Sequence, residues 1–146
     1  MSPDPAALAI LHARCFETPR PWTRTEFGNL LADTKTIFAG EENGFALGRV
    51  VLDEAELLTI AVAPEKRQAG VGNMLLSGFE SAAFGMGART CFLEVAANNR
   101  AAIALYTTNN YTESGRRRGY YAQKNAPAVD AILLSKPLNA PEIGGN

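Results

Sequence analysis

The chain has 146 residues, of which 47% are hydrophobic and 20% are charged, and its 14 basic and 15 acidic residues leave a formal net charge of −1. This length fits one domain with a sizeable core. The near-neutral charge gives no sign of bulk affinity for nucleic acid or membranes, and no apolar run approaches the roughly 20 residues of a membrane span. Cys15 and Cys91 are widely spaced, which favours a reduced compartment over a zinc site.

The first predicted element is a helix over residues 5–14. Asp4 is suited to the N-cap position, and Pro5 is suited to the first helical position. His12 lies on this helix, and we interpret it as a surface or capping residue rather than a catalytic one.

A second helix is predicted over residues 24–31, because Thr23 and Glu26 have the spacing of a capping box. Trp22 stands just before the cap, where a hydrophobic residue often packs against the first turns as a staple.

The remaining elements alternate between strands and helices. Strands are predicted over residues 36–41, 45–52, 56–62, 90–95, 111–118 and 129–136, with an Asn43-Gly44 hairpin turn and a turn at 53–55. Helices are predicted from Gly70 to Gly85 or Gly87, and after Asn98-Asn99, where an Asn can cap. Cys91 is expected to be a buried small hydrophobe. The first three strands should be antiparallel, and the strands flanking the Gly70 helix should be parallel through a right-handed crossover.

The connection from the apolar strand 57–62 to the following helix carries an anion-binding pattern. The order is a strand ended by Pro64, then Arg67-x-x-Gly70-x-Gly72 at the start of a helix. The first amides of a helix lack intrahelical partners and carry the positive end of the helix dipole. Glycines let a phosphate approach the backbone closely. Neither the Walker pattern nor G-x-G-x-x-G is present, so a mononucleotide P-loop and a Rossmann site are disfavoured. An ordinary strand-to-helix turn remains the alternative.

A glutamate interrupts the next apolar strand, in Cys91-Phe92-Leu93-Glu94-Val95. A buried, unpaired carboxylate is costly, so Glu94 must be solvated, paired or functional. In a strand it faces away from Leu93 and Val95. The alternative to a functional role is that Glu94 lines an exposed face or pairs with an arginine. Tyr106 has a similar alternative, in which its ring packs a helix onto the sheet.

Together these patterns resemble the GCN5-related N-acetyltransferase superfamily, whose pyrophosphate loop reads [Q/R]-x-x-G-x-[G/A]. More narrowly, the chain resembles the ribosomal-protein N-terminal alanine acetyltransferases. The matching phrases extend over most of residues 11–134, and they are LHARCF, PW, LLTIAVAP, LEVAANNRAAIALY, RRRGYY and DAILL.

The resemblance implies an α+β fold with one central mixed sheet of about six strands and about four helices. Only four residues precede Pro5, so we expect the family's first strand to be missing. The acetyltransferase domain is expected over residues 1–138, followed by a flexible tail over 139–146. Asn109-Asn110-Tyr111 replaces the family's usual small-Gly-Phe segment, and the loop 122–128 lacks an acidic run often found there.

The resemblance also implies roles for particular residues. Glu94 matches the family's general base, usually acting through water, and Tyr106 matches its general acid. The backbone of Ile60-Ala61-Val62 matches the strand that pairs with pantetheine. The matching pyrophosphate and coenzyme positions are Arg67, Gln68, Ala69, Gly70, Val71, Gly72, Asn73 and Asn99, with Tyr106 also near the coenzyme. The substrate peptide should lie between the loops that carry Phe16, Trp22, Tyr120 and Tyr121.

The implied activity is acetyl transfer from acetyl-CoA, without a metal, to the N-terminal amine of a protein, an alanine on a ribosomal protein. Two alternatives are a small-molecule or antibiotic N-acetyltransferase and a non-catalytic acetyl-CoA-binding module. We further expect a cytoplasmic monomer or weak homodimer that contacts neither nucleic acid nor membrane.

Overall fold

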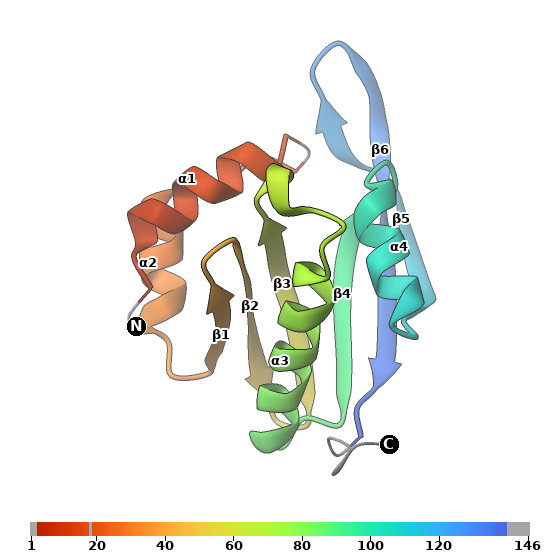
Figure 1. Ribbon diagram of the computed structural model, residues 1–146. Helices are drawn as coiled ribbons and strands as arrows, with labels where there is room; N and C mark the ends of the chain where they lie inside the picture. The colour runs from red at the N-terminus through yellow and green to blue at the C-terminus, as the bar shows by residue number, and fades with distance from the viewer. Residues whose placement is uncertain (1–2, 18, 140–146) are drawn as a thin grey trace.

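The computed structural model of the protein describes residues 3–17 and 19–139, which form four α-helices, one short 3-10 helix and six strands (Figure 1). The helices are α1 (Pro5–Cys15), α2 (Arg24–Ala32), α3 (Val71–Gly85) and α4 (Arg100–Thr108), with the 3-10 helix at Pro64–Lys66. The strands are β1 (Thr36–Glu41), β2 (Gly44–Val51), β3 (Glu54–Val62), β4 (Thr90–Ala96), β5 (Thr112–Gln123) and β6 (Ala126–Pro137).

All six described strands belong to one sheet in the order β1-β2-β3-β4-β6-β5. The pair β3–β4 is parallel and the other pairs are antiparallel. This arrangement confirms the predicted mixed sheet and the crossover through α3. In the described residues the first strand, β1, follows two helices and forms one edge of the sheet. The hairpin β5–β6 projects beyond the rest of the sheet (Figure 1).

The predicted helix starts are confirmed by their caps. Asp4 accepts a hydrogen bond from the Ala6 amide at 3.1 Å. Thr23 and Glu26 form the reciprocal capping box. The Trp22 ring lies 5.4 Å from the Phe27 ring, so Trp22 is the predicted staple of α2.

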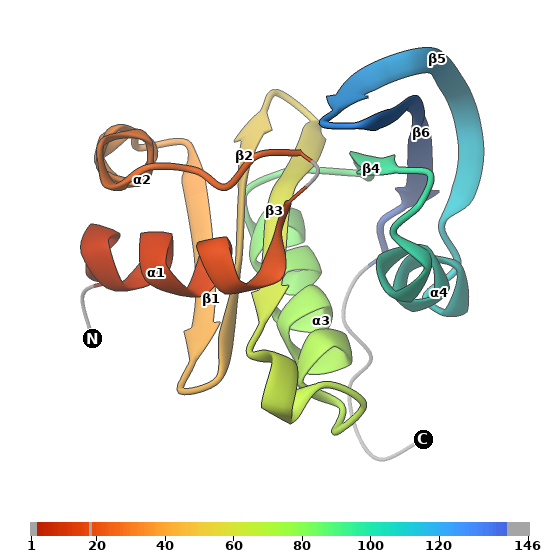
Figure 2. The ribbon, with the colours of Figure 1, turned by 90° about the horizontal axis from the view of Figure 1, so that it is seen from above.

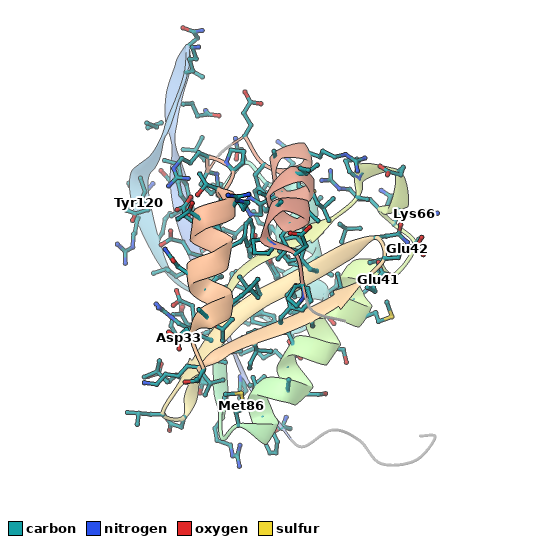
Figure 3. The ribbon with its side chains drawn as sticks, turned by 90° about the vertical axis from the view of Figure 1, so that its left-hand side faces the viewer. Asp33, Glu41, Glu42, Lys66, Met86 and Tyr120 are labelled. Carbon is teal, nitrogen blue, oxygen red and sulfur yellow. The ribbon has the colours of Figure 1, made fainter. Side chains whose placement is uncertain are left out.

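Two packing clusters cover the two faces of the sheet. On one face, α3 and α4 pack through Leu75, Leu76, Phe79 and Tyr106 against the strands. On the other face, α1 and α2 lie across β1–β3 (Figures 2 and 3) and pack through Leu8 and Phe27. Cys91 is fully buried in the first cluster, as predicted, and burial raises the pKa of its thiol to about 11.

The last two strands are longer than predicted. Strands 111–118 and 129–136 were expected with a loop at 122–128, but β5 and β6 continue to a two-residue turn at 124–125. Most of β5 is exposed on both faces, so its sequence has no alternation to mark its extent. The turn between β2 and β3 also differs from the prediction of 53–55. It lies at residues 52–53, where Leu52 adopts a φ of 57°, an unusual value for leucine.

At the chain end, Leu138 is buried against the core. Residues 140–146 of the predicted tail lie outside the described residues, so the tail stays a prediction.

A bulge in β3 changes which helices its side chains face. Leu47 pairs with Thr59 and Gly48 pairs with Leu57, so Leu58 is an extra residue in β3. Before the bulge, Leu57 packs in the α3 cluster. After it, Ala61 packs in the α1–α2 cluster. Strict alternation would have placed Leu57 and Ala61 on the same face, so the bulge turns the last part of β3 toward α1.

Candidate functional site

Strands β3 and β4 pair along only part of their length. Their register extends from Glu54–Thr90 to Leu57–Leu93 and ends there. Beyond that point β3 continues to Val62, while β4 continues to Ala96 paired with β6. The end of β3 therefore presents an edge that β4 does not cover, which is the kind of edge an extended ligand can join by strand addition.

A large cleft of about 660 Å³ lies along this uncovered edge of β3. The end of α1, the loop before α3 and one side of α4 also border the cleft. Most residues predicted to contact the coenzyme line it, namely Ile60, Ala61, Val62, Arg67, Gln68, Gly70, Gly72, Asn73 and Asn99. Ala69 and Val71 belong to the same loop and helix start but do not line the cleft. Tyr106 lines a neighbouring cavity instead.

The start of α3 meets the requirements for holding an anion in this cleft. Gly70 is the N-cap, with a φ of 84° that favours glycine, and no side chain caps the helix. The first turn contains no acidic residue, so the amides after Gly70 and the positive helix end have no competing carboxylate on the helix. Lys66 and Arg67 add positive charge just before the cap. These groups fit a phosphate or pyrophosphate.

A small cavity of about 320 Å³ adjoins the cleft. The two hollows share four lining residues: Phe16, Ile60, Asn99 and Ala102. The small cavity is lined by all four residues predicted to contact the substrate and by both predicted catalytic residues, that is by Phe16, Trp22, Tyr120, Tyr121, Glu94 and Tyr106. The structure thus gathers residues from the α1–α2 loop, β4, α4 and β5 around one space. In Figure 3, Tyr120 and Lys66 lie on opposite sides of the view, with α1 and α2 between them.

Glu94 is partly exposed, with 26% of its side chain accessible, and both of its oxygens have neighbours on β5. The Tyr121 hydroxyl donates a hydrogen bond of 2.7 Å to Oε1. The Arg117 Nε lies 3.5 Å from Oε2. Pairing with an arginine, the alternative considered for Glu94, is therefore observed, although the carboxylate also lines the cavity. Burial and the bond to Glu94 raise the pKa of Tyr121, so its hydroxyl keeps its proton.

Tyr106 is buried in the first packing cluster, and its ring lies 5.8 Å from that of Tyr111 in an edge-on arrangement. Its packing role is thus observed, and the same side chain lines the small cavity. Burial raises the pKa of Tyr106, so its phenol stays protonated at neutral pH.

The interpretation of His12 as a surface or capping residue is wrong. Its side chain is buried, with 1% of the residue exposed, and it lines the small cavity. The Trp22 amide donates to Nδ1 at 3.0 Å, and Nε2 lies 2.9 Å from the Thr59 hydroxyl. Helical spacing does place His12 on the inward face, four residues after Leu8 and three before Cys15, but a polar histidine was not expected to be buried there.

In residues 3–17 and 19–139, no group of three or more histidine, cysteine, aspartate or glutamate side chains is placed to hold a metal ion. No helix in the same part of the chain is long and apolar enough to cross a membrane.

Three features thus stand together: β3 and β4 separate after Leu57, α3 begins at a glycine without a side-chain cap, and a carboxylate lies beside the separation. Residues 6–111 match the acetyltransferase (GNAT) family model, and the chain belongs to this family of acyltransferases. Members of the family use acetyl-CoA.

Within this family, the chain is similar to N-terminal acetyltransferases of known specificity or name. The chain is 37% identical over 123 residues to the ribosomal protein bS18-alanine N-acetyltransferase of Escherichia coli, covering 82% of each protein. It is 33% identical over 134 residues to the N-alpha-acetyltransferase RimI of Mycobacterium tuberculosis, covering 86% of this chain and 83% of that protein. The crystal structure of the Escherichia coli S18-alanine enzyme superposes with a TM-score of 0.80 at 33% identity, over 94% of this chain and 89% of that one.

The burial of His12 predicts a pH-dependent loss of stability. Burial lowers the pKa of His12 to about 4, and Glu26 is the charged group that opposes this effect. In the unfolded chain His12 is protonated below about pH 6.5, whereas in the folded chain it stays neutral until about pH 4. His12 thus stabilises the fold above pH 6.5, and this contribution is lost as the pH falls toward 4. Between pH 7 and pH 5 the loss should be about 2 kcal/mol.

Denaturant unfolding of the wild type and of His12→Phe at both pH values measures this difference. Because His12 is the chain's 1 histidine, the variant removes this class of group entirely while keeping the carboxylates. Equal pH slopes for the two proteins would contradict the assignment.

Proposed function

We propose that the protein transfers the acetyl group of acetyl-CoA to the α-amino group of an N-terminal alanine, with a small-subunit ribosomal protein of the S18 type as the acceptor. The observation that carries the proposal is the shared wall between the large cleft and the small cavity, beside which Glu94 and Tyr106 both lie. The names of the relatives at 33–37% identity support the choice of acceptor. A ribosomal acceptor would place the reaction in the cytoplasm.

The large cleft is the proposed coenzyme site. Gly72 and Asn73 line this cleft and, with Val71 beside them, carry the first free amides of α3, which we assign to the pyrophosphate. The uncovered edge of β3 from Ile60 to Val62 offers backbone groups to the amides of the pantetheine arm. Arg67 both lines the cleft and donates from Nε to the Val62 carbonyl at 3.3 Å, which links the loop to the strand.

Glu94 is the proposed general base. A peptide α-amino group has a pKa of about 7.7 to 8.0, so a single carboxylate acting through water can remove its proton near neutral pH. Lysine, with a pKa of about 10.4, would require roughly 3 to 4 kcal/mol more. The hydrogen bond from Tyr121 and the ion pair with Arg117 hold the carboxylate at the cavity wall. The lower pKa of the α-amino group favours an N-terminus over a lysine side chain as the acceptor.

Tyr106 is the proposed general acid. The neutral amine forms the new N–C bond, the C–S bond of the thioester breaks, and the departing thiolate needs a proton. The Tyr106 phenol is protonated at neutral pH and lines the small cavity, so it is placed to supply that proton. Neither a metal nor a covalent enzyme intermediate is required.

The function is tested by intact-mass analysis of peptides incubated with the protein and acetyl-CoA. A peptide that begins with alanine and contains an internal lysine should gain one acetyl group. The same peptide with a blocked N-terminus should gain none, because the lysine amine is the harder one to deprotonate. Acetylation of small amines or an aminoglycoside in place of peptides would support the small-molecule alternative. If the protein binds acetyl-CoA but acetylates no amine, the result would support the non-catalytic binding module instead.

The base assignment predicts that Glu94→Gln lowers kcat/KM on the alanine peptide by roughly 100-fold at neutral pH. The deficit should shrink as the pH rises, because more of the amine is then already neutral. Acetyl-CoA affinity, measured by calorimetry, should stay near that of the wild type. The matched comparison is Glu56→Gln, which removes the other carboxylate of the cavity, one that is paired with Arg49 at 2.9 Å. A deficit independent of pH would assign Glu94 a positioning role instead.

The acid assignment predicts that Tyr106→Phe lowers kcat by roughly 100-fold or more, with acetyl-CoA binding and melting temperature nearly unchanged. The ring and its packing remain, and only the hydroxyl is lost. An acyl donor with a more acidic thiol should recover part of the rate.

The control for this variant is Tyr111→Phe. The Tyr111 hydroxyl donates to Glu80 at 2.8 Å on the α3 side of the sheet, and Tyr111 lines neither hollow. Its loss should cost about 1 kcal/mol of stability and little turnover. If Tyr106→Phe behaves like Tyr111→Phe, Tyr106 has only its packing role.

A further inference from the structure

The His12 side chain joins α1 to the loop that follows it and to β3, which is distant in the sequence. It belongs to α1, accepts the Trp22 amide of the α1–α2 loop (described at residues 16–17 and 19–22), and meets Thr59 of β3. Its ring stacks on Phe16 at a centroid distance of 4.3 Å and lies 5.2 Å from the ring of Trp22. Both aromatic residues line the small cavity, and so does His12.

The two hydrogen bonds assign the protonation state of the ring. Nδ1 accepts the Trp22 N–H, so in a neutral imidazole the proton sits on Nε2, which donates to the Thr59 hydroxyl. A ring protonated at both nitrogens would set two N–H donors against each other at Trp22. The arrangement therefore requires neutral His12, which agrees with its burial.

We propose that His12 is a positioning residue for the acceptor, which fixes the α1–α2 loop against β3 so that Phe16 and Trp22 form the wall facing Glu94 and Tyr106. This role rests on the proposed function, since it assigns the small cavity to the acceptor. An apolar side chain could fill the same volume, but it would leave the Trp22 amide without its partner and the loop free to shift. His12 should thus affect acceptor binding more than coenzyme binding, because Trp22 lines only the small cavity while Phe16 lines both hollows.

Thr59 is the second member of this arrangement. It is 7% exposed and follows the bulge residue Leu58, which is what turns it toward α1. Its neighbour Ile60 lines both hollows, so β3 carries the acceptor-side contact and the coenzyme-side edge on adjacent residues. The experiment must therefore measure acceptor binding and coenzyme binding separately.

Fluorescence tests the loop contact without any substrate, because Trp22 is the chain's 1 tryptophan. His12→Phe keeps a ring but removes both bonds. His12→Asn keeps an acceptor oxygen close to the position of Nδ1. Thr59→Val removes the hydroxyl with little change in shape. Trp22 emission should shift to longer wavelength and become more open to acrylamide in His12→Phe, with the smallest change in His12→Asn. Emission and quenching equal to the wild type in His12→Phe would overturn the proposal, even if no peptide acceptor is found.

Kinetics test the positioning role. His12→Phe should raise the KM for the alanine peptide about 10-fold, as expected from one buried amide left unpaired, while the acetyl-CoA Kd stays within about 2-fold. Thr59→Val should raise the KM by less, and His12→Asn should restore part of it. Val50→Ala, in the cluster on the opposite face, is the control for general loss of stability and should leave the KM unchanged. Equal loss of peptide and coenzyme affinity, or a lowered melting temperature with unchanged KM, would make His12 merely structural.

Discussion

The site depends on the point at which β3 stops pairing with β4. Pairing ends at Leu57–Leu93, and the next residue of β3, Leu58, is the bulge. An extra residue in a strand bends it and increases its twist, so the bulge and the loss of the parallel partner belong to the same change in direction. Three consequences follow from it. One edge of β3 becomes available to a ligand, Thr59 turns toward α1, and a space opens between β3 and β4 where Glu94 and Tyr106 lie.

The two hollows also differ in their polar groups. The large cleft has Arg67 and the positive end of a helix without an acidic first turn, with Glu17 at its edge. The small cavity has the carboxylates of Glu56 on β3 and Glu94 on β4, each paired with an arginine, among aromatic and aliphatic residues. Under the proposed function, the large cleft suits a pyrophosphate and the small cavity suits an amine that arrives as a cation. The two hollows share a wall, so the groups that attract each reactant also bring the reacting atoms toward the same place.

The elements with local signals were predictable from the sequence. The caps at Asp4 and Thr23, the Gly70 loop and the alternation of Leu93-Glu94-Val95 each depend on neighbouring residues. The features that were missed either lacked a local sequence signal or depended on tertiary contacts. Leu52 takes a turn position without glycine or asparagine, and the ends of β5 follow backbone pairing rather than side-chain alternation. The burial of His12 was missed because one of its partners, Thr59, lies 47 residues away on β3.

For Glu94, the functional and structural readings turn out not to exclude each other. A carboxylate on a partly exposed strand would sample several rotamers and lose entropy on each encounter with a substrate. Here Tyr121 holds one oxygen, and Arg117 lies beside the other. Both partners come from β5, which is otherwise largely exposed and interrupted by bulges. The β5–β6 hairpin thus has a definite task under the proposed function. It orients the base from one side of the cavity, while the His12-bound loop shapes the wall on the other. Because Tyr121 is also part of the cavity wall, an acceptor that contacts Tyr121 would act directly on the hydrogen bond that orients Glu94.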